Sequence, residues 1–156
     1  MHNVAVLFTR HESDGMCNSD ELLKILLSLQ PDVIFEEIGY EVYDQIYLQN
    51  RTTLESNAVK LYLLTKDVEH FPVDTFDRPD SYRSGWNLLS NVLEPYRNKS
   101  DALKHAINQL IYQSQVGGFP FLNSDQNDAI LDEIEKEERS ILAELADDYL
   151  IQIAQL

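Results

Sequence analysis

The sequence predicts an α/β fold: a small, mostly parallel sheet of three to four strands, with flanking helices and a helical C-terminal half. Two short, β-rich apolar runs, residues 4–9 and 33–35, are typical of strands buried on both faces of a parallel sheet. A segment rich in leucine separates them at the length of a strand–helix–strand crossover. From residue 85 onward the apolar residues recur at helical spacing.

The remaining elements follow from start and stop signals along the chain. The first helix is predicted to begin at Ser19, with Asp20 and Glu21 in its first turn, and to end at Pro31. Residues 38–48 and 53–66 predict two more helices, and residues 70–74 predict a third, short strand. Beyond the turn-forming stretch 75–84, helices are predicted over 85–97, 100–115 and 124–155, with a clear break at 117–120.

Length and composition bound the class of protein. A chain of 156 residues predicts a single domain, with an α/β portion over 1–78 and a helical portion over 79–156. Its net charge of −15 argues against a nucleic-acid binder and against docking on an anionic membrane surface. No apolar window approaches the length of a membrane span, Cys17 is the only cysteine, and we expect no export signal. We therefore expect a cytoplasmic protein.

The last predicted helix, residues 124–155, is unusually acidic. Residues 125–148 hold ten acidic and two basic side chains, while Ile130, Ile134, Ile141 and Leu145 recur on one face. The pattern fits an amphipathic helix packed on the domain with a solvated acidic face. It also fits a helix for self-association or for a basic protein partner. A further hypothesis is an acidic mimic that occupies a cationic site on another protein.

Polar side chains follow each predicted strand. The first strand is followed by Arg10, His11, Glu12, Ser13 and Asp14; the second ends in Glu36 and Glu37, and the third in Asp74. Carboxyl ends of parallel strands meet at one edge of a sheet, where ligands bind. Imidazole and carboxylates suit manganese, cobalt or zinc, and a metal-bound water would hydrolyse an amide or ester. Alternatively, these residues are loop starters and helix caps in an acid-rich chain.

Several motifs occur in the order seen in a known family. They are Phe8-Thr9-Arg10-His11, then residues 30–37 (Gln-Pro-Asp-Val-Ile-Phe-Glu-Glu), then Glu55-Ser56-Asn57-Ala58 leading to Pro72-Val73-Asp74. Together they resemble the N-terminal half of the TraB/PrgY/GumN-like family, which is grouped with Tiki proteins and ChaN/erythromycin-esterase-like proteins. The resemblance covers residues 3–78. Two features differ: Phe8 stands at the first motif's glycine, and no second Gly-x-x-His motif follows Gly118.

The resemblance implies an α/β fold and divalent-metal-dependent hydrolysis of peptide or ester bonds. His11 and Glu36 are then predicted metal ligands and Glu37 and Asp74 the catalytic carboxylates, with the two glutamates interchangeable and Asp74 a ligand or a base. Further site candidates are Arg10, Glu12, Asp14, Glu55 and Arg78. His70 and His105 are the residues of this chain able to replace the missing imidazole. The alternative hypothesis is a non-catalytic, shortened family member that binds proteins through its acidic C-terminal helix.

Overall fold

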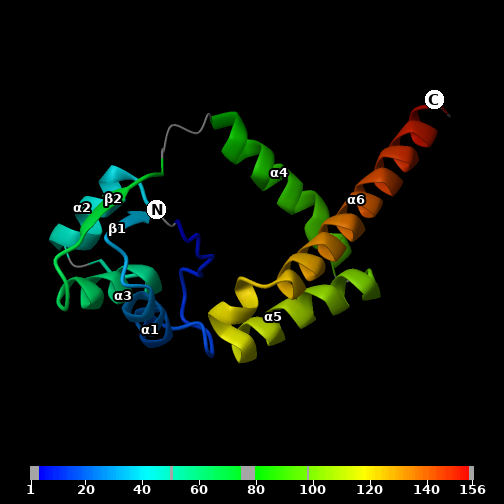
Figure 1. The fold of residues 1–156 in the computed structure, drawn as a ribbon. Helices are drawn as coiled ribbons and strands as arrows, with labels where there is room; N and C mark the ends of the chain where they lie inside the picture. Colours follow the sequence, from blue (N-terminus) through cyan, green and yellow to red (C-terminus); the bar gives the residue numbers. More distant parts are fainter. Residues whose placement is uncertain (1–3, 50, 75–79, 98, 155–156) are drawn as a thin grey trace. The chain divides into compact units, whose positions relative to one another are not determined.

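The computed structural model describes residues 4–49, 51–74, 80–97 and 99–154, without the side chains of residues 80, 83, 86 and 147–154. These ranges hold six helices and two strands (Figure 1). In chain order they are α1 (Ser19–Leu29), β1 (Val33–Glu36), α2 (Tyr40–Gln49), α3 (Leu54–Leu63), β2 (Glu69–Pro72), α4 (Asp80–Arg97), α5 (Asp101–Leu122) and α6 (Asp125–Ala154).

The predicted fold class is wrong. The described chain is mostly helical, and its one sheet has two strands, not three to four. Residues 4–9 form no strand, and Val4 and Phe8 are 89% and 65% exposed. The Asn123 side chain takes the place of a neighbouring strand: its Oδ1 accepts from the Phe8 amide at 2.8 Å, and its Nδ2 donates to the Phe8 carbonyl at 3.1 Å. The Asn123 side chain forms these two hydrogen bonds with the backbone of Phe8 alone, so they do not continue as the ladder of hydrogen bonds that joins two strands.

The chain divides into two compact units. Unit 1 comprises Met1–Arg78 and Ser114–Asn123, and unit 2 comprises Pro79–Gln113 and Ser124–Leu156. The second half of α5 therefore belongs to unit 1. The break predicted at residues 117–120 is confirmed, since Gly118 has φ +60° and interrupts the helical conformation of α5.

Unit 1 contains the sheet, in which β1 and β2 are parallel. The connection between them runs through α2 and α3, and the register pairs Ile34 with His70 and Glu36 with Pro72. Burial alternates along both strands, so the sheet has one covered and one exposed face. The expectation that residues 33–35 are buried on both faces is therefore wrong, because Phe35 is 68% exposed.

The core of unit 1 lies between α1 and α3. Its fully or nearly fully buried apolar side chains include Leu22, Ala58, Tyr62 and Phe119. The predicted start of α1 is confirmed: the Asn18 side chain accepts from the Glu21 amide at 3.0 Å. Thr53 and Ser56 form a reciprocal capping box at the start of α3. Local capping signals therefore fix the ends of the two helices that form the core.

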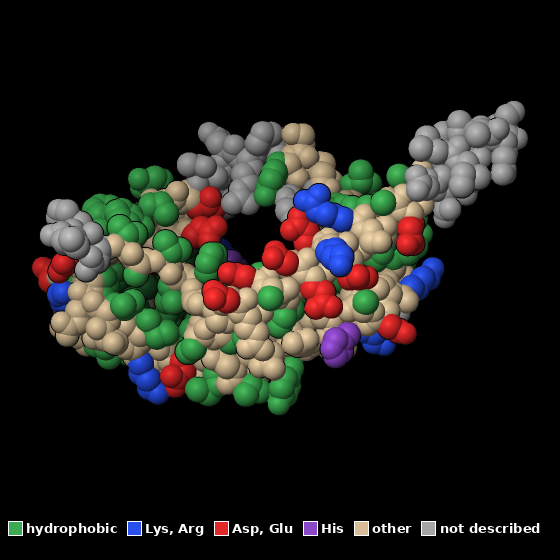
Figure 2. All heavy atoms as spheres, turned by 45° about the vertical axis from the view of Figure 1, so that its right-hand side comes forward, with side chains coloured by type: hydrophobic (Ala, Val, Ile, Leu, Met, Phe, Trp, Pro, Cys, Tyr) green, Lys and Arg blue, Asp and Glu red, His purple; other side chains and the backbone are tan. Residues whose placement is uncertain are grey.

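Unit 2 is helical, as predicted for the C-terminal half. Helix α4 packs against α6, and Leu93, Leu103, Ala106 and Ile130 are buried. Most of the acidic side chains that the structure describes in α6 are exposed. Figure 2 shows exposed acidic side chains on the face that it draws. Among the described helices, none combines the length and apolar character needed to cross a membrane.

Candidate functional site

His11, the predicted metal ligand, pairs with Glu55. Its Nδ1 lies 3.0 Å from Oε1 of Glu55, and the Thr9 hydroxyl donates to the same oxygen at 3.1 Å. The His11 backbone carbonyl accepts from the Leu54 amide at 3.3 Å, which ties this segment to the start of α3. The His11 side chain is 82% exposed, whereas that of Glu55 is 21% exposed. Two predicted site residues are thus brought together, near the surface of unit 1.

The other candidates from the N-terminal polar cluster form a separate group. Arg10 and Asp14 make an ion pair at 3.3 Å, and Asp14 also accepts from the Gln115 side chain at 3.3 Å. Glu12 is exposed. Arg78 lies outside the described residues. The contacts of Arg10 and Asp14 hold a loop together and assign no chemistry to it.

Glu36, Glu37 and Asp74 lie at the carboxyl end of the sheet, as predicted. The Val73 amide donates to the Glu36 carbonyl at 2.9 Å, and the Asp74 amide donates to the Ile38 carbonyl at 3.1 Å. These residues therefore share one edge, with Glu37 exposed and Asp74 half-buried. His11 does not complete a metal site with them: among the described residues, no three His, Cys, Asp or Glu side chains lie together in a group that could hold a metal ion.

Glu36 instead belongs to a buried hydrogen-bond network with His70. Oε1 of Glu36 lies 2.9 Å from Nδ1 of His70, and the Tyr47 hydroxyl donates to both carboxylate oxygens at 2.8 and 2.7 Å. The side chains of Glu36 and His70 are only 8% and 17% exposed. Because Glu36 has a donor on each oxygen, burial does not leave it unsatisfied. We call Glu36, His70, Tyr43 and Tyr47 the Glu36–His70 network.

The strand register and α2 together build this network. His70 pairs with Ile34 across the sheet, and Glu36 lies two residues beyond Ile34, so both side chains point to the covered face. Tyr43 and Tyr47 are four residues apart on α2 and therefore lie on one side of the helix. Their ring centroids lie 5.3 and 4.7 Å from that of His70.

Both phenols of the network are held in their protonated form. Burial, the hydrogen bond with Glu36 and the charge of Glu36 raise the pKa of Tyr47 far above its ordinary value. Burial and the charges of Glu36 and Asp44 also raise the pKa of Tyr43. The Tyr43 hydroxyl lies 3.2 Å from Nε2 and 3.3 Å from Nδ1 of His70. Both tyrosines thus act as hydrogen-bond donors at ordinary pH.

The hydrogen bonds fix the tautomer of a neutral His70. Glu36 can only accept, so Nδ1 of His70 must carry the proton, and the lone pair of the neutral ring is left on Nε2. A carboxylate that orients an imidazole in this way is the arrangement of a general base. The network therefore provides a nitrogen able to remove a proton, with a phenol donor 3.2 Å away.

Sequence reasoning identified Glu36 but not its partners. His70 is named above only as one of two histidines able to replace a missing imidazole, and Tyr43 and Tyr47 are not among the predicted site residues. A period-2 count along the two predicted strands would have placed Glu36 and His70 on one face. No such pattern in the sequence marks Tyr43 and Tyr47, because their contact with Glu36 and His70 depends on how α2 packs on the sheet.

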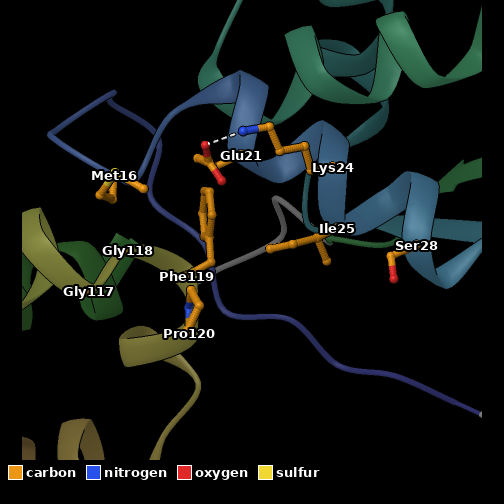
Figure 3. Close-up of a pocket in the computed structure, with 9 residues that line it drawn as sticks. All are labelled: Met16, Glu21, Lys24, Ile25, Ser28, Gly117, Gly118, Phe119 and Pro120. Carbon is orange, nitrogen blue, oxygen red and sulfur yellow. Dashed lines mark hydrogen bonds and ion pairs between the residues drawn. The ribbon is translucent and has the colours of Figure 1, made fainter.

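Unit 1 also has a cavity of about 240 Å³ between α1 and the segment around Gly118 (Figure 3). Its lining is mainly apolar, with Met16, Ile25, Phe119 and Pro120. Glu21 and Lys24 form an ion pair of 2.6 Å at its edge, toward which the ring of Phe119 points. The hydrogen bond with Glu21 raises the pKa of Lys24, which keeps the ammonium charged opposite the Glu21 carboxylate. The cavity contains no imidazole or thiol, and we assign it no reaction.

The function of this chain is inferred from the geometry of the residues described above. No protein-family model, no curated protein and no solved structure matches the chain.

Proposed function

We propose that this chain is a hydrolase of peptide or ester bonds whose general base is His70, oriented by Glu36. One observation carries the proposal: the 2.9 Å contact between Nδ1 of His70 and Oε1 of Glu36, on the covered face of a parallel sheet. The substrate class is the one that the resemblance to the TraB/Tiki-like families implies. The role proposed here for Glu36 differs from the predicted one, because Glu36 orients His70.

In this proposal Nε2 of His70 removes a proton from a water molecule, whose oxygen attacks the carbonyl carbon of the substrate. The negative charge that develops on the carbonyl oxygen requires a hydrogen-bond donor. We assign this donor to Tyr43, whose hydroxyl lies 3.2 Å from Nε2 of His70 and would turn from that nitrogen to the carbonyl oxygen as His70 takes up the proton. The proton held by His70 then passes to the leaving amine or alkoxide, which balances the reaction. Glu36 stabilises the imidazolium that exists between the two proton transfers.

The test is hydrolysis of p-nitrophenyl acetate and of a fluorogenic peptide mixture by wild type and His70→Gln. His105→Gln is the matched control, because His105 is an exposed histidine of α5 in unit 2. We expect His70→Gln to lower kcat by about 10²-fold or more, and His105→Gln to leave it unchanged. Equal rates for wild type and His70→Gln, or no wild-type rate above buffer with either substrate, would overturn the proposal.

A divalent metal remains a separate prediction. Manganese, cobalt or zinc was expected at His11 and Glu36, but the described residues offer no group of three ligands, so no step above uses a metal. The test is metal content by inductively coupled plasma mass spectrometry, in wild type and His11→Ala after metal is added back. Near-stoichiometric metal that is lost in His11→Ala would support a resident metal. No metal in either protein would contradict it.

A second candidate function is protein binding through α6. The observation that favours it is the exposure of most of the acidic side chains that this helix carries along its described length. A basic protein segment, or a second copy of this chain, is the proposed partner. Deleting residues 125–156 should abolish oligomer formation or partner capture while unit 1, which contains none of these residues, stays folded. A binding partner that survives the deletion would exclude this role. We place both functions in the cytoplasm.

A further inference from the structure

The exposed face of the sheet is apolar. Val33, Phe35, Phe71 and Val73 are 39, 68, 44 and 53% exposed, and the rings of Phe35 and Phe71 stack at 6.1 Å. We call these four residues the outer sheet face. The Glu36–His70 network lies on the opposite face, which α2 covers. Parallel strands occur almost only in sheets with both faces covered, and the usual cover is a helix.

The outer sheet face is bordered by negative charge. Glu69 pairs with Val33 at the start of the ladder, and Glu37 directly follows the last pair, Glu36 with Pro72. The two glutamates are exposed and lie about 13 Å apart along the strands, at roughly 3.3 Å per residue. Lys66, which precedes β2, is already paired with Asp32 at 3.5 Å. The border therefore selects for a cationic neighbour.

The charge argues against a second copy of the chain as the cover. Two outer sheet faces packed together would bring four glutamates to one interface, in a protein with a net charge of −15. A helix with basic residues about 13 Å apart, or two to three turns, would instead place an apolar stripe on Phe35 and Phe71 and a cation at each glutamate.

We propose that the outer sheet face binds an amphipathic, basic helix of another protein, with its apolar stripe on Phe35 and Phe71 and its basic residues at Glu37 and Glu69. This surface shares no residue with α6 or with the Glu36–His70 network, so the proposal does not depend on either function above. The partner helix has one apolar face and carries a lysine or arginine at each end of that face.

The test is binding of a fluorescent helical peptide of about 18 residues, with Leu and Ile on one face and Lys at both flanks. The matched probe carries Glu in place of Lys. We expect wild type to bind the Lys peptide at least 10-fold more tightly than the Glu peptide. The double variant Phe35→Ser/Phe71→Ser should weaken binding of the Lys peptide by 10-fold or more. The control is Leu88→Ser, which removes a 66% exposed leucine from α4 and should leave binding unchanged.

The charge-reversal variant Glu37→Lys/Glu69→Lys keeps the apolar residues, so it tests the border even if the phenylalanine variant does not fold. We expect it to lose the preference for the Lys peptide and to gain affinity for the Glu peptide. Binding unaffected by either double variant would overturn the proposal. Wild-type self-association that disappears in Phe35→Ser/Phe71→Ser would also overturn it, since a second copy would then be the cover.

Discussion

Unit 1 holds two imidazole–carboxylate pairs that have nearly the same geometry and very different surroundings. His70 and Glu36 lie 2.9 Å apart with side chains 17% and 8% exposed. His11 and Glu55 lie 3.0 Å apart, but the His11 side chain is 82% exposed. The first pair rests on two paired strands and a helix. The second joins an irregular segment to the first turn of α3.

The difference shows that contact distance alone does not identify a reactive pair. Water competes for the exposed imidazole of His11, so its pair with Glu55 contributes little. Around His70, Tyr47 and Glu36 fix the ring, and a low local dielectric strengthens each hydrogen bond. The sequence motif draws attention to His11, whereas the structure gives His70 the better-defined environment.

The largest expected effect is the loss of stability in Gly15→Ala, a change in the segment that carries His11 and not in the elements that carry His70 and Glu36. Gly15 has φ +56°, and a Cβ there would lie 2.3 Å from the carbonyl oxygen of Gln115. We expect a loss of about 3–5 kcal/mol in the free energy of unfolding, from clash and backbone strain in the segment that carries His11. Urea unfolding measures it. The control is Gly85→Ala in α4, where a Cβ meets nothing within 4 Å and stability should not fall. An equal effect of both variants would contradict this account.

The second change compares the two carboxylates directly. Glu36→Ala removes a buried acceptor and leaves Tyr47 and His70 without their partner, so we expect a loss of about 3 kcal/mol. Glu55→Ala should cost about 1 kcal/mol or less. Oε2 of Glu55 is buried without a hydrogen-bond partner among the described residues, and its removal relieves a desolvation penalty that offsets part of the loss. Thermal and urea unfolding of both variants would check this. A larger loss for Glu55→Ala would reverse the ranking of the pairs.

A smaller effect is expected at the two tyrosines. Tyr47→Phe removes the donor to both oxygens of Glu36 and should cost about 1.5 kcal/mol. Tyr43→Phe should cost about 0.5 kcal/mol, since its hydroxyl contacts His70 only at 3.2–3.3 Å. In hydrolysis, Tyr43→Phe should nevertheless lower kcat more than Tyr47→Phe does. Equal effects of the two variants on kcat would remove the assigned role of Tyr43.

The smallest expected effect is a pH dependence at Cys17, which lies six residues after His11. Burial raises the pKa of the thiol; Arg10 opposes this and Asp14 adds to it. A raised pKa means that the folded state holds the proton more tightly, so the stabilisation is complete below pH ~8.5 and is lost as the pH rises further. As the pH rises above ~8.5, wild type should lose slightly more stability than Cys17→Ala. Parallel pH curves for the two proteins would contradict it.

The thiol also reports on the segment that carries His11. Cys17 is fully buried, and its Sγ lies 3.5 Å from the Ser114 carbonyl. Wild type should therefore react slowly with iodoacetamide at neutral pH, and Gly15→Ala should react much faster. Fast alkylation of the folded wild type would mean that the segment does not stay in place.

Local signals predicted most helices and both strands, but not the fold class. The caps at Asn18 and Thr53 act within a few residues, so the sequence marks the ends of α1 and α3. Residues 4–9 have the composition of a strand, yet a strand requires a partner, and Asn123 occupies that position for Phe8. The candidate site likewise has one part that the sequence predicts and one part that it does not. Glu36 follows from strand-end position, whereas Tyr47 depends on how α2 packs, which no short-range pattern specifies.

The most direct test of the central claim compares the two histidines in one assay. His70→Gln and His11→Gln should be measured side by side for kcat/KM on the same ester and peptide substrates, with folding verified by circular dichroism. We predict a loss of about 10²-fold or more for His70→Gln and less than about 3-fold for His11→Gln. The reverse result, with His11→Gln inactive and His70→Gln unaffected, would contradict the assignment of the Glu36–His70 network.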